Sequence, residues 1–382
     1  MGFESQNHLL APGPVAIPEE ILQVLSRPMI HHRTPEFTKI LTRVLEQLKN
    51  IFVTEQPVML LSSTGTGAMQ AALTNTLSSE DEILVVESGK FGERWSKIAK
   101  SFGVTVHTLE VEWGKSVVTK DIEVLLRKHP KIKAICTQAC ETSTATSHPI
   151  KEIASLTKND PNRILIVDAI TALIYQELPM DDWGIDVLVA GSQKAFMLPA
   201  GLSMIALSEK AWAFSTHSTL PKFYFDLQAE LNANQKGQTH FSSAVTHIRA
   251  LDAILDQFEK IGLQKVIAQA KKIQQAIISA CQEFQLSIFA TCPTVTAIKV
   301  PNDLDGTQIR DHMELDFNVT VMGGQDQLKG KILRIGHMGY IKESDLIVCF
   351  EALAKGLNDH NFIVSQDQIE NAKQKIQESF SQ

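Results

Sequence analysis

A lysine follows an apolar run near the middle of this chain. Residues 185–189 read Ile-Asp-Val-Leu-Val, which is typical of a buried strand, and Lys194 stands in the loop at the carboxyl end of that run. In a partly dry pocket a lysine amine loses its proton more readily and can form a Schiff base with a carbonyl group. The pattern makes Lys194 a candidate nucleophile, with a solvated surface lysine as the alternative.

A carboxylate takes the equivalent place after a second apolar run. Residues 164–167 read Ile-Leu-Ile-Val, so Asp168 is expected at the carboxyl end of a buried parallel strand, where open α/β sheets bind ligands. A carboxylate at such a place can pair with the protonated ring nitrogen of a cofactor. The alternative is that Asp168 caps a helix that begins near Ile170.

A loop of small hydroxylated residues precedes a helical pattern. Residues 62–67 read Ser-Ser-Thr-Gly-Thr-Gly and follow the apolar run 58–61. Backbone N–H groups at a helix start, with hydroxyls beside them, can bind a phosphate dianion. Thr64 or Thr66 could instead be a simple N-cap. Because no Lys or Arg is near this loop in the sequence, a dianion there would need further hydrogen-bond donors.

These three blocks, in this order, resemble the class V aminotransferases, which are pyridoxal phosphate enzymes of fold type I. The Ser-Gln-Lys block ending at Lys194, the Val-Asp-Ala block around Asp168 and the loop at residues 63–67 all match, and the resemblance covers nearly the whole chain. It extends to alanine–glyoxylate, serine–pyruvate and serine–glyoxylate aminotransferases and to bacterial sequences labelled as small subunits of a soluble hydrogenase. The five cysteines show no Cys-x-x-Cys or similar arrangement that would hold iron, nickel or an iron–sulfur centre.

The resemblance implies roles for particular residues. Pyridoxal phosphate is expected on Lys194, beside Gln193, with Asp168 at the ring nitrogen. Arg334 is expected to bind the α-carboxylate of the substrate, because a planar guanidinium in an apolar run suits a carboxylate. A structural salt bridge is the alternative for Arg334. The other expected cofactor contacts are Thr64, Gly65, Thr66, Phe91, Thr142, Thr239 and Ser242.

Some of these expected contacts depart from the family pattern. Phe91 stands where the mammalian alanine–glyoxylate enzymes carry Trp and is expected to stack on the cofactor ring, with a core Phe at a helix start as the alternative. Thr142 is expected to offer its hydroxyl to the ring oxygen. Thr239 and Ser242 are expected to reach the cofactor phosphate of a neighbouring subunit, although Phe241 replaces a Tyr that is frequent in this motif.

The composition is that of an ordinary globular protein. The 382 residues can bury a substantial core and could form two domains; 44% are hydrophobic, 21% are charged and the net charge is −7, which gives no support to nucleic-acid binding. Five cysteines, an odd number, suit a reducing compartment. No signal-peptide pattern and no apolar run near the roughly 20 residues of a membrane helix are present, so a cytoplasmic protein without a membrane partner is expected.

Alternating strand and helix patterns predict an α/β fold with three layers and a largely parallel sheet. A large αβα domain is expected over residues 1–263, with an arm at residues 1–17 near the active site, and a smaller α+β domain over residues 264–382. Residues 202–207 are expected to return antiparallel beside the lysine strand. The remaining expectations are a surface excursion at 220–238 and a polar, helical segment that frays at 366–382.

The predicted function is a ping-pong transfer of an amino group from a small amino acid, alanine or serine, to a 2-oxo acid such as glyoxylate or pyruvate. The alternatives are an aspartate or aminophosphonate donor, a lyase of the cysteine desulfurase type, and a non-catalytic assembly subunit. A homodimer with shared active sites is expected. No metal site is expected, because the adjacent His31 and His32 do not share a helix face; their loop is expected to shape the substrate mouth.

Overall fold

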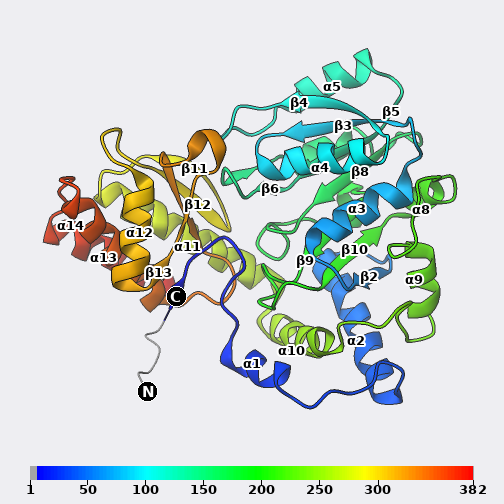
Figure 1. The fold of residues 1–382 in the computed structure, drawn as a ribbon, viewed down its shortest axis with the longest axis horizontal. Helices are drawn as coiled ribbons and strands as arrows, with labels where there is room; N and C mark the ends of the chain where they lie inside the picture. The colour runs from blue at the N-terminus through cyan, green and yellow to red at the C-terminus, as the bar shows by residue number, and fades with distance from the viewer. Residues whose placement is uncertain (1–6, 382) are drawn as a thin grey trace.

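The structure is a computed structural model that describes residues 7–381 of the chain. Two layered units lie side by side in it, one built on a seven-stranded sheet and the other on a four-stranded sheet (Figure 1). The N-terminal segment, drawn in dark blue, runs between the two units before the chain enters the larger one. The predicted combination of a large α/β unit and a smaller α+β unit is therefore what the fold contains.

The seven-stranded sheet carries the edge at which the candidate residues were expected. Its strands lie in the order β2, β10, β9, β8, β5, β3, β4, and all neighbours are parallel except that β10 runs antiparallel to β2 and β9. The mostly parallel sheet and the antiparallel return beside the lysine strand are thus confirmed. The strands are β2 (Val58–Leu61), β3 (Glu82–Glu87), β4 (Thr105–Glu110), β5 (Ile132–Gln138), β8 (Ile164–Asp168), β9 (Val187–Gly191) and β10 (Ser203–Leu207).

Helices cover both faces of this sheet because successive apolar residues of a strand point to opposite sides. On β3, Leu84 and Val86 enter one core, whereas Ile83 and Val85 enter the core on the other face. The first core also receives residues from α1 (Glu19–Leu25), α2 (Pro35–Phe52), α5 (Thr119–Lys128), α6 (Ile150–Ser155), α7 (Met180–Trp183) and α10 (Val245–Ile261). The second receives residues from α3 (Gly65–Thr76), α4 (Lys90–Ser101), α8 (Glu209–Ser215) and α9 (Leu227–Asn234).

The smaller unit packs helices on an antiparallel sheet around a core of its own. The sheet has the order β11 (Ile288–Cys292), β12 (Val295–Lys299), β15 (Ile332–Gly336), β14 (Met322–Gly323). Its helices are α11 (Leu263–Glu283), α12 (Gly306–Phe317), α13 (Glu343–Asp359) and α14 (Gln366–Phe380), with a short 3₁₀ turn at Asp326–Leu328. Within residues 7–381, no helix combines the length and the apolar composition needed to cross a membrane.

Two segments differ from the sequence-based expectation. Residues 366–380 form α14, which packs on α11 and α13 and buries Ala372 and Ile376, so they do not fray as expected. These two residues are four apart and share one helix face within an otherwise polar sequence. Residues 220–238 contain α9, and Leu227 is buried there. The domain boundary near residue 264 stays a prediction, although α11 begins at Leu263.

The N-terminal arm joins the two units. Strand β1 (His8–Leu9) pairs in parallel with β13 (Val319–Thr320) of the smaller unit, and Leu10 is buried in that unit's core. The chain then turns, and Val15 is buried in a core of the larger unit. The turn between these two anchors brings the backbone of the arm to the carboxyl end of β9, where the loop carrying Lys194 begins.

Candidate active site

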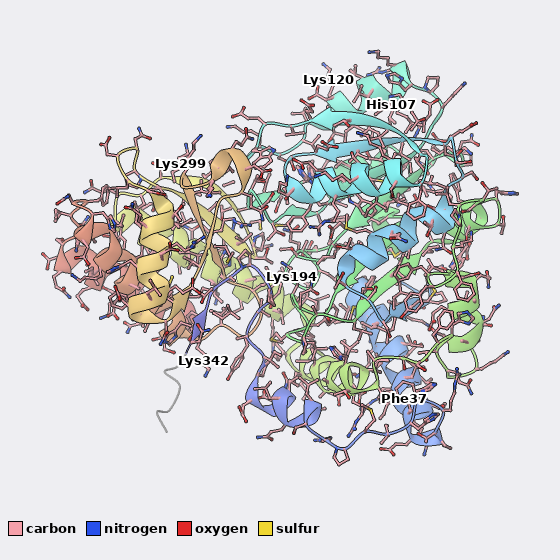
Figure 2. The ribbon with its side chains drawn as sticks, viewed as in Figure 1. Phe37, His107, Lys120, Lys194, Lys299 and Lys342 are labelled. Atoms are coloured by element: carbon pink, nitrogen blue, oxygen red, sulfur yellow. The ribbon has the colours of Figure 1, made fainter. Side chains whose placement is uncertain are left out.

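Loops at the carboxyl ends of β2, β8 and β9 surround one cavity of about 280 Å³. Lys194 lies in the middle of the molecule, between the two units (Figure 2). The cavity is lined by expected cofactor residues, namely Thr64, Gly65, Thr66, Phe91, Thr142, Asp168, Gln193 and Lys194. Its other lining residues are Gly13, Pro14, Arg94, Ile170, Thr171 and Ala200. Residues that are far apart in the sequence therefore meet at one place, as the parallel-strand argument predicts.

Lys194 is a buried amine with one fixed partner. Its Nζ donates a hydrogen bond to the carbonyl oxygen of Pro12 in the N-terminal arm. Burial lowers the pKa of Lys194 to about 8, against the opposing attraction of the Asp168 carboxylate. An amine with this pKa is partly neutral near pH 7, which is the form that attacks a carbonyl carbon or takes up a proton.

Gly13 allows the arm to approach this lysine closely. Its φ is +93°, and a Cβ built at this position would lie 2.5 Å from Nζ and 2.6 Å from Cε of Lys194. Both the backbone conformation and the space therefore require glycine. The expected nearness of the arm to the active site takes a specific form, because Gly13 and Pro14 line the cavity and the backbone of Pro12 holds the lysine.

Asp168 lies at the end of β8 and is 5% exposed. Its Oδ1 accepts a hydrogen bond of 2.8 Å from the N–H of Ile170, so the side chain does stabilise the following turn. Residues 170–175 form turns rather than an α-helix, and the expected alternative of a helix cap is not what the structure shows. Burial raises the pKa of Asp168 to about 7, and the Glu141 carboxylate adds to that rise. A positive charge placed in the cavity would favour the ionised carboxylate.

The expected phosphate loop forms the start of α3. The helix begins at Gly65, and the side chain of the N-cap residue Thr64 makes no capping hydrogen bond. The N–H groups of a first helical turn have no partner within the helix and attract anions. No Lys or Arg is near this loop in the sequence, but the fold brings a cation there, because Nη1 of Arg94 on α4 donates a hydrogen bond of 3.2 Å to Thr66 Oγ1.

Phe91 stands on the first turn of α4 and is half-buried beside the cavity. It belongs to none of the apolar cores found within residues 7–381, so the alternative of a core Phe is not supported. The guanidinium carbon of Arg94 lies 4.7 Å from the centroid of the Phe91 ring. Stacking of Phe91 on a cofactor ring stays a prediction.

Glu141 fixes the start of α4 and the loop that follows β5. This residue ends the short strand β6 (Cys140–Glu141), which pairs with β7 (Thr146–Ser147). Its buried carboxylate accepts hydrogen bonds from Phe91 N at 3.1 Å, Gly92 N at 3.0 Å, Ser143 N at 3.1 Å and Gln138 Nε2 at 3.1 Å. Burial raises the pKa of Glu141, whereas its hydrogen-bond donors lower it. Because its partners are donors, the ionised carboxylate fits this position.

The polar groups around the cavity fit pyridoxal phosphate. A helix start and Arg94 suit a phosphate dianion, Asp168 suits a ring nitrogen, and Lys194 suits an aldehyde. Thr142 Oγ1 lies 2.6 Å from Thr171 Oγ1, which places a hydroxyl pair in the cavity wall. Gln193 Oε1 is buried and has no hydrogen-bond partner among residues 7–381, so an acceptor in the wall is left for a ligand.

Arg334 lies on β15 and is 4% exposed. Its Nη1 donates to Thr142 O at 2.9 Å, and its Nε and Nη2 donate to Gly323 O at 3.1 and 2.9 Å. Burial lowers its pKa to about 10, while the Glu141 carboxylate raises it. Among the described residues Arg334 has no ion pair, so the alternative of a structural salt bridge is not observed. Of the five N–H groups of a guanidinium, three bond to the backbone and two remain.

Thr239 and Ser242 lie apart from the Lys194 cavity. Both line a smaller pocket that also contains Tyr224 and Phe241. Thr239 is buried, and its Oγ1 donates a hydrogen bond of 2.7 Å to Phe241 O. The role expected for these two residues concerns a second subunit, and it stays a prediction.

Several cavity residues escaped the sequence reasoning, namely Arg94, Ile170, Thr171 and Ala200. A signal for Arg94 was present, because it follows Phe91 by three residues and therefore shares its helix face. Thr171 lies in the turn directly after Asp168, where a hydroxyl near the cavity was also foreseeable. Nothing in the sequence indicates that the backbone carbonyl of Pro12 would hold Lys194.

Known proteins resemble this chain over most of its length. The family model "Aminotransferase class-V" matches residues 18–326. The chain is 35% identical to the soluble hydrogenase 42 kDa subunit of Anabaena cylindrica, covering 90% of this chain and 91% of that one. Identity is 32% with the L-aspartate–glyoxylate aminotransferase of Paracoccus denitrificans, over 89% and 88% of the two chains. It is 31% with the serine–glyoxylate aminotransferase of Arabidopsis thaliana, over 94% and 92%.

The fold leads to the same family. The crystal structure of ureidoglycine–glyoxylate aminotransferase from Bacillus subtilis superposes with a TM-score of 0.93 at 27% identity and covers 99% of each chain. That agreement extends across both units and confirms the predicted fold type. Because the family model matches residues 18–326, which is most of the chain, this chain belongs to the class V aminotransferases. It is an aminotransferase whose cofactor is pyridoxal phosphate.

Proposed function

We propose that this enzyme transfers the amino group of a small amino acid, alanine or serine, to a 2-oxo acid such as glyoxylate or pyruvate in a ping-pong sequence. The observation that carries the proposal is the meeting of Lys194, Asp168 and the start of α3 around one cavity of about 280 Å³. Glyoxylate stands in the names of the aspartate, serine and ureidoglycine enzymes to which the chain is similar, which supports glyoxylate as the acceptor.

Pyridoxal phosphate supplies the carbonyl group that links to amines and the ring that withdraws electrons from the substrate Cα. Lys194 moves the proton: its Nζ, with a pKa near 8, takes the Cα proton as a neutral amine and returns it as an ammonium group. The Pro12 carbonyl orients Nζ for this work. Asp168 holds a proton at the ring nitrogen, because a buried carboxylate is stabilised by a neighbouring positive charge.

Arg334 binds the α-carboxylate of the amino acid with the N–H groups that its backbone partners leave free. The bonds to Thr142 O and Gly323 O hold its guanidinium plane in one orientation, so little conformational entropy is lost when a carboxylate binds. The cavity wall is small or apolar at Pro14, Ile170 and Ala200. A wall of this kind favours donors with short side chains.

One observation favours aspartate as a second candidate donor. A cleft of about 450 Å³ shares Phe91 and Arg94 with the Lys194 cavity, and its wall contains Lys90, Lys97, Arg310 and Lys329 besides the single carboxylate of Asp326. Lys329 has no ion pair among residues 7–381. Such a cationic wall attracts a substrate that carries a second carboxylate.

The cysteines do not support a desulfurase. A desulfurase needs a cysteine on a mobile loop as the sulfur acceptor, whereas all five cysteines of this chain are buried. The closest pair is Cys140 and Cys292, with 2.8 Å between the Sγ atoms, and each lies in a strand. One thiol pair also does not make a four-thiolate site for an iron–sulfur cluster, which is the group that a hydrogenase name would suggest.

The test is Lys194→Ala together with a panel of donors. We expect the variant to bind the cofactor without a covalent link and to show no transamination. Borohydride reduction of the wild-type enzyme followed by peptide mapping should place the label on Lys194. Alanine, serine and aspartate, each assayed against glyoxylate, pyruvate and 2-oxoglutarate, then identify the substrates. A label on another lysine, or turnover by the variant, contradicts the assignment.

We also propose a homodimer in which each subunit completes the site of the other. Support comes from the position of Thr239 and Ser242 in the stretch that matches the family motif, and from their place in a pocket outside the Lys194 cavity. In a twofold dimer the same residues on both subunits would be brought to both sites.

A further inference from the structure

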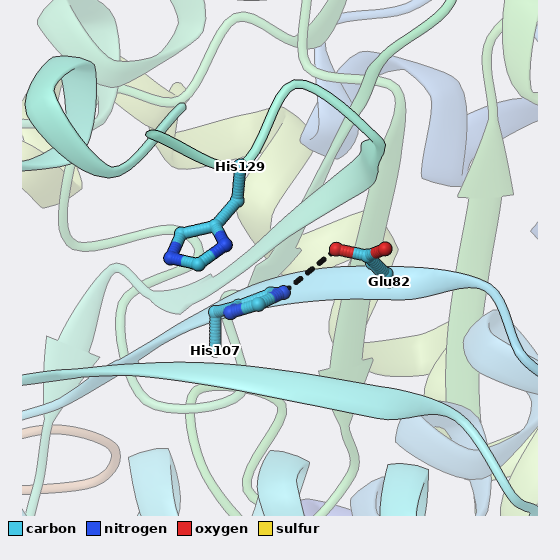
Figure 3. Close-up of side chains that lie close together, drawn as sticks. All are labelled: Glu82, His107 and His129. Atoms are coloured by element: carbon cyan, nitrogen blue, oxygen red, sulfur yellow. Dashed lines mark hydrogen bonds and ion pairs between the residues drawn. The ribbon is translucent and has the colours of Figure 1, made fainter. Parts of the chain in front are cut away.

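A cluster of two histidines and one carboxylate lies near the amino ends of β3 and β4, whereas Lys194 lies beyond the carboxyl end of β9. It consists of Glu82 at the first position of β3, His107 on β4, and His129 at the end of α5 (Figure 3). Lys194 follows the carboxyl end of β9, whereas Glu82 begins β3, which runs in the same direction. In Figure 2, His107 lies at the far side of the larger unit.

Sheet register brings the first two residues together. Thr105 is the partner of Glu82 on β4, and His107, two residues further, points to the same face. Nε2 of His107 lies 2.8 Å from Oε2 of Glu82. The loop after α5 then places the His129 ring over His107, with 3.9 Å between the ring centroids. One candidate ligand atom from each residue lies within 4.8 Å of the others.

The pairing of Glu82 with His107 leaves the third residue unexplained. Among residues 7–381, the imidazole of His129 has no hydrogen-bond or ion-pair partner, and the dashed line in Figure 3 joins only the other two side chains. All three are half-buried and reachable from solvent. Glu82 also lines a neighbouring cavity of about 710 Å³, whose wall includes neither histidine of the cluster.

We propose that Glu82, His107 and His129 form a zinc site, with a water molecule as the fourth ligand. Two imidazoles and one carboxylate are a donor set that Zn²⁺ prefers, and three protein ligands leave one position exchangeable. Magnesium and calcium prefer oxygen ligands alone, so the two histidines disfavour them. The spacing of the three ligands in the sequence matches no recognisable metal motif. The register of β3 and β4 brings Glu82 and His107 together, and the end of α5 brings His129 to them.

The bound ion would join two strands and a loop of the sheet edge. Zinc would bring these ligand atoms, which lie within 4.8 Å of one another, to positions about 2.0–2.2 Å from the metal, in place of the bond between Glu82 and His107. Zinc that binds the folded chain and not the unfolded one raises the Tm by mass action. This proposal does not depend on the proposed function, because neither zinc binding nor Tm reports on transamination.

The experiment measures zinc binding by the full-length chain loaded with pyridoxal phosphate. Equilibrium dialysis with metal analysis should give one high-affinity zinc ion per chain, and zinc should raise the Tm. His129→Gln should lower the zinc affinity by at least about 100-fold, because losing a direct ligand costs no less than losing an outer-shell partner. Glu82→Gln keeps the side-chain shape and should weaken binding in the same direction. Cobalt should show the visible bands of a four-coordinate ion in the wild type but not in these two variants.

A matched control is available on α12. His312 pairs with Asp316 at 2.9 Å and Asp359 at 3.3 Å, and its side chain is 21% exposed, close to the 20% of His107. His312→Gln should leave zinc affinity and the cobalt spectrum unchanged. Equal zinc affinity in the wild type and the folded His129→Gln variant, or no zinc-dependent change in Tm, overturns the site. If His129→Gln does not fold, the comparison rests on Glu82→Gln, and an unchanged affinity there overturns it equally.

Discussion

At the scale of single residues, burial shifts Lys194 and Asp168 towards their neutral forms. The pKa of the amine falls to about 8 and that of the carboxyl rises to about 7, so both titrate close to physiological pH. Their opposite charges partly offset these shifts, since each attracts the other. Asp168 can therefore become ionised beside a positively charged ring nitrogen, and Lys194 can become neutral to react with a carbonyl group.

Asp168→Asn should lower the turnover number by several orders of magnitude, because an amide cannot hold a proton on the ring nitrogen and the ring then withdraws electrons poorly. Cofactor affinity should change much less. Steady-state rates and the absorption spectrum of the bound cofactor measure the two effects. Asp186→Asn is the control, since this carboxylate lies at the other end of the lysine strand and bonds to Leu165 N. Its folded fraction should keep normal turnover, and a similar result for Asp168→Asn would make Asp168 only a turn residue.

Arg334→Lys should raise the KM for the amino donor strongly, because an ammonium group cannot reproduce a planar grip on a carboxylate or the two bonds to Gly323 O. The cofactor spectrum should stay normal, since the variant leaves Lys194 and Asp168 in place. Kinetics with donor and acceptor varied in turn measure the effect. Arg310→Lys, in the basic cleft, should leave alanine and serine unaffected. An unchanged KM for both substrates would contradict the assignment of Arg334.

At the scale of elements, the first turn of α4 forms part of the cavity wall. One helical turn carries Phe91 and Arg94, and it is anchored by Glu141 from the hairpin of β6 and β7. Glu141 also accepts a hydrogen bond from Ser143 N, which belongs to the same peptide group as Thr142 O, the acceptor for Arg334. A single carboxylate therefore connects the expected stacking ring, the cation beside the phosphate loop and the expected substrate-binding arginine.

Glu141→Gln should destabilise the protein by about 1–3 kcal/mol, because an amide turns one acceptor into a donor that faces N–H groups. The KM for the donor should rise as well, since the wall moves. Urea unfolding and steady-state kinetics measure these effects. Glu93→Gln on the same helix removes only the partly exposed pairs with Lys90 and Lys97 and should cost less than about 1 kcal/mol. If both variants lose equal stability, Glu141 does not anchor α4.

The sequence was sufficient to predict a site residue where that residue directly follows the end of a buried strand. Lys194 and Asp168 each follow an apolar run, and parallel strands bring their carboxyl ends to a common edge. The phosphate loop followed from the helix start at Gly65. Arg94 does not follow from the residues near the loop in sequence, because α4 brings it there from another segment. The Pro12 contact depends on strand pairing between distant segments, which periodicity does not reveal.

At the scale of the whole molecule, the two units meet around the lysine. The loop carrying Lys194 belongs to the larger unit, Arg334 belongs to the smaller one, and the N-terminal arm passes between them. A relative movement of the units would change the distance between the reacting amine and the expected carboxylate-binding group. The hydrogen bond from Arg334 to Thr142 O links the smaller unit to the larger one across this boundary.

The proposed dimer can be tested by complementation. Lys194→Ala should be inactive, and a Thr239→Ala and Ser242→Ala double variant should be impaired if these residues serve the partner's site. A heterodimer of the two carries both defects in one site and neither defect in the other, so mixed samples should regain activity. Refolding the variants together and assaying the mixture measures this. A fully active monomer in light scattering at assay concentration contradicts shared sites.

The pairing of β1 with β13 also has a consequence for how the enzyme is made. A ribosome produces His8 and Leu9 more than 300 residues before their partners Val319 and Thr320. At about 5–20 residues per second this delay lasts tens of seconds. The Pro12 carbonyl cannot accept its hydrogen bond from Lys194 until the arm is anchored by β13 on one side and by the core around Val15 on the other. During synthesis Lys194 therefore stays without its Pro12 partner until Val319 and Thr320 have been made.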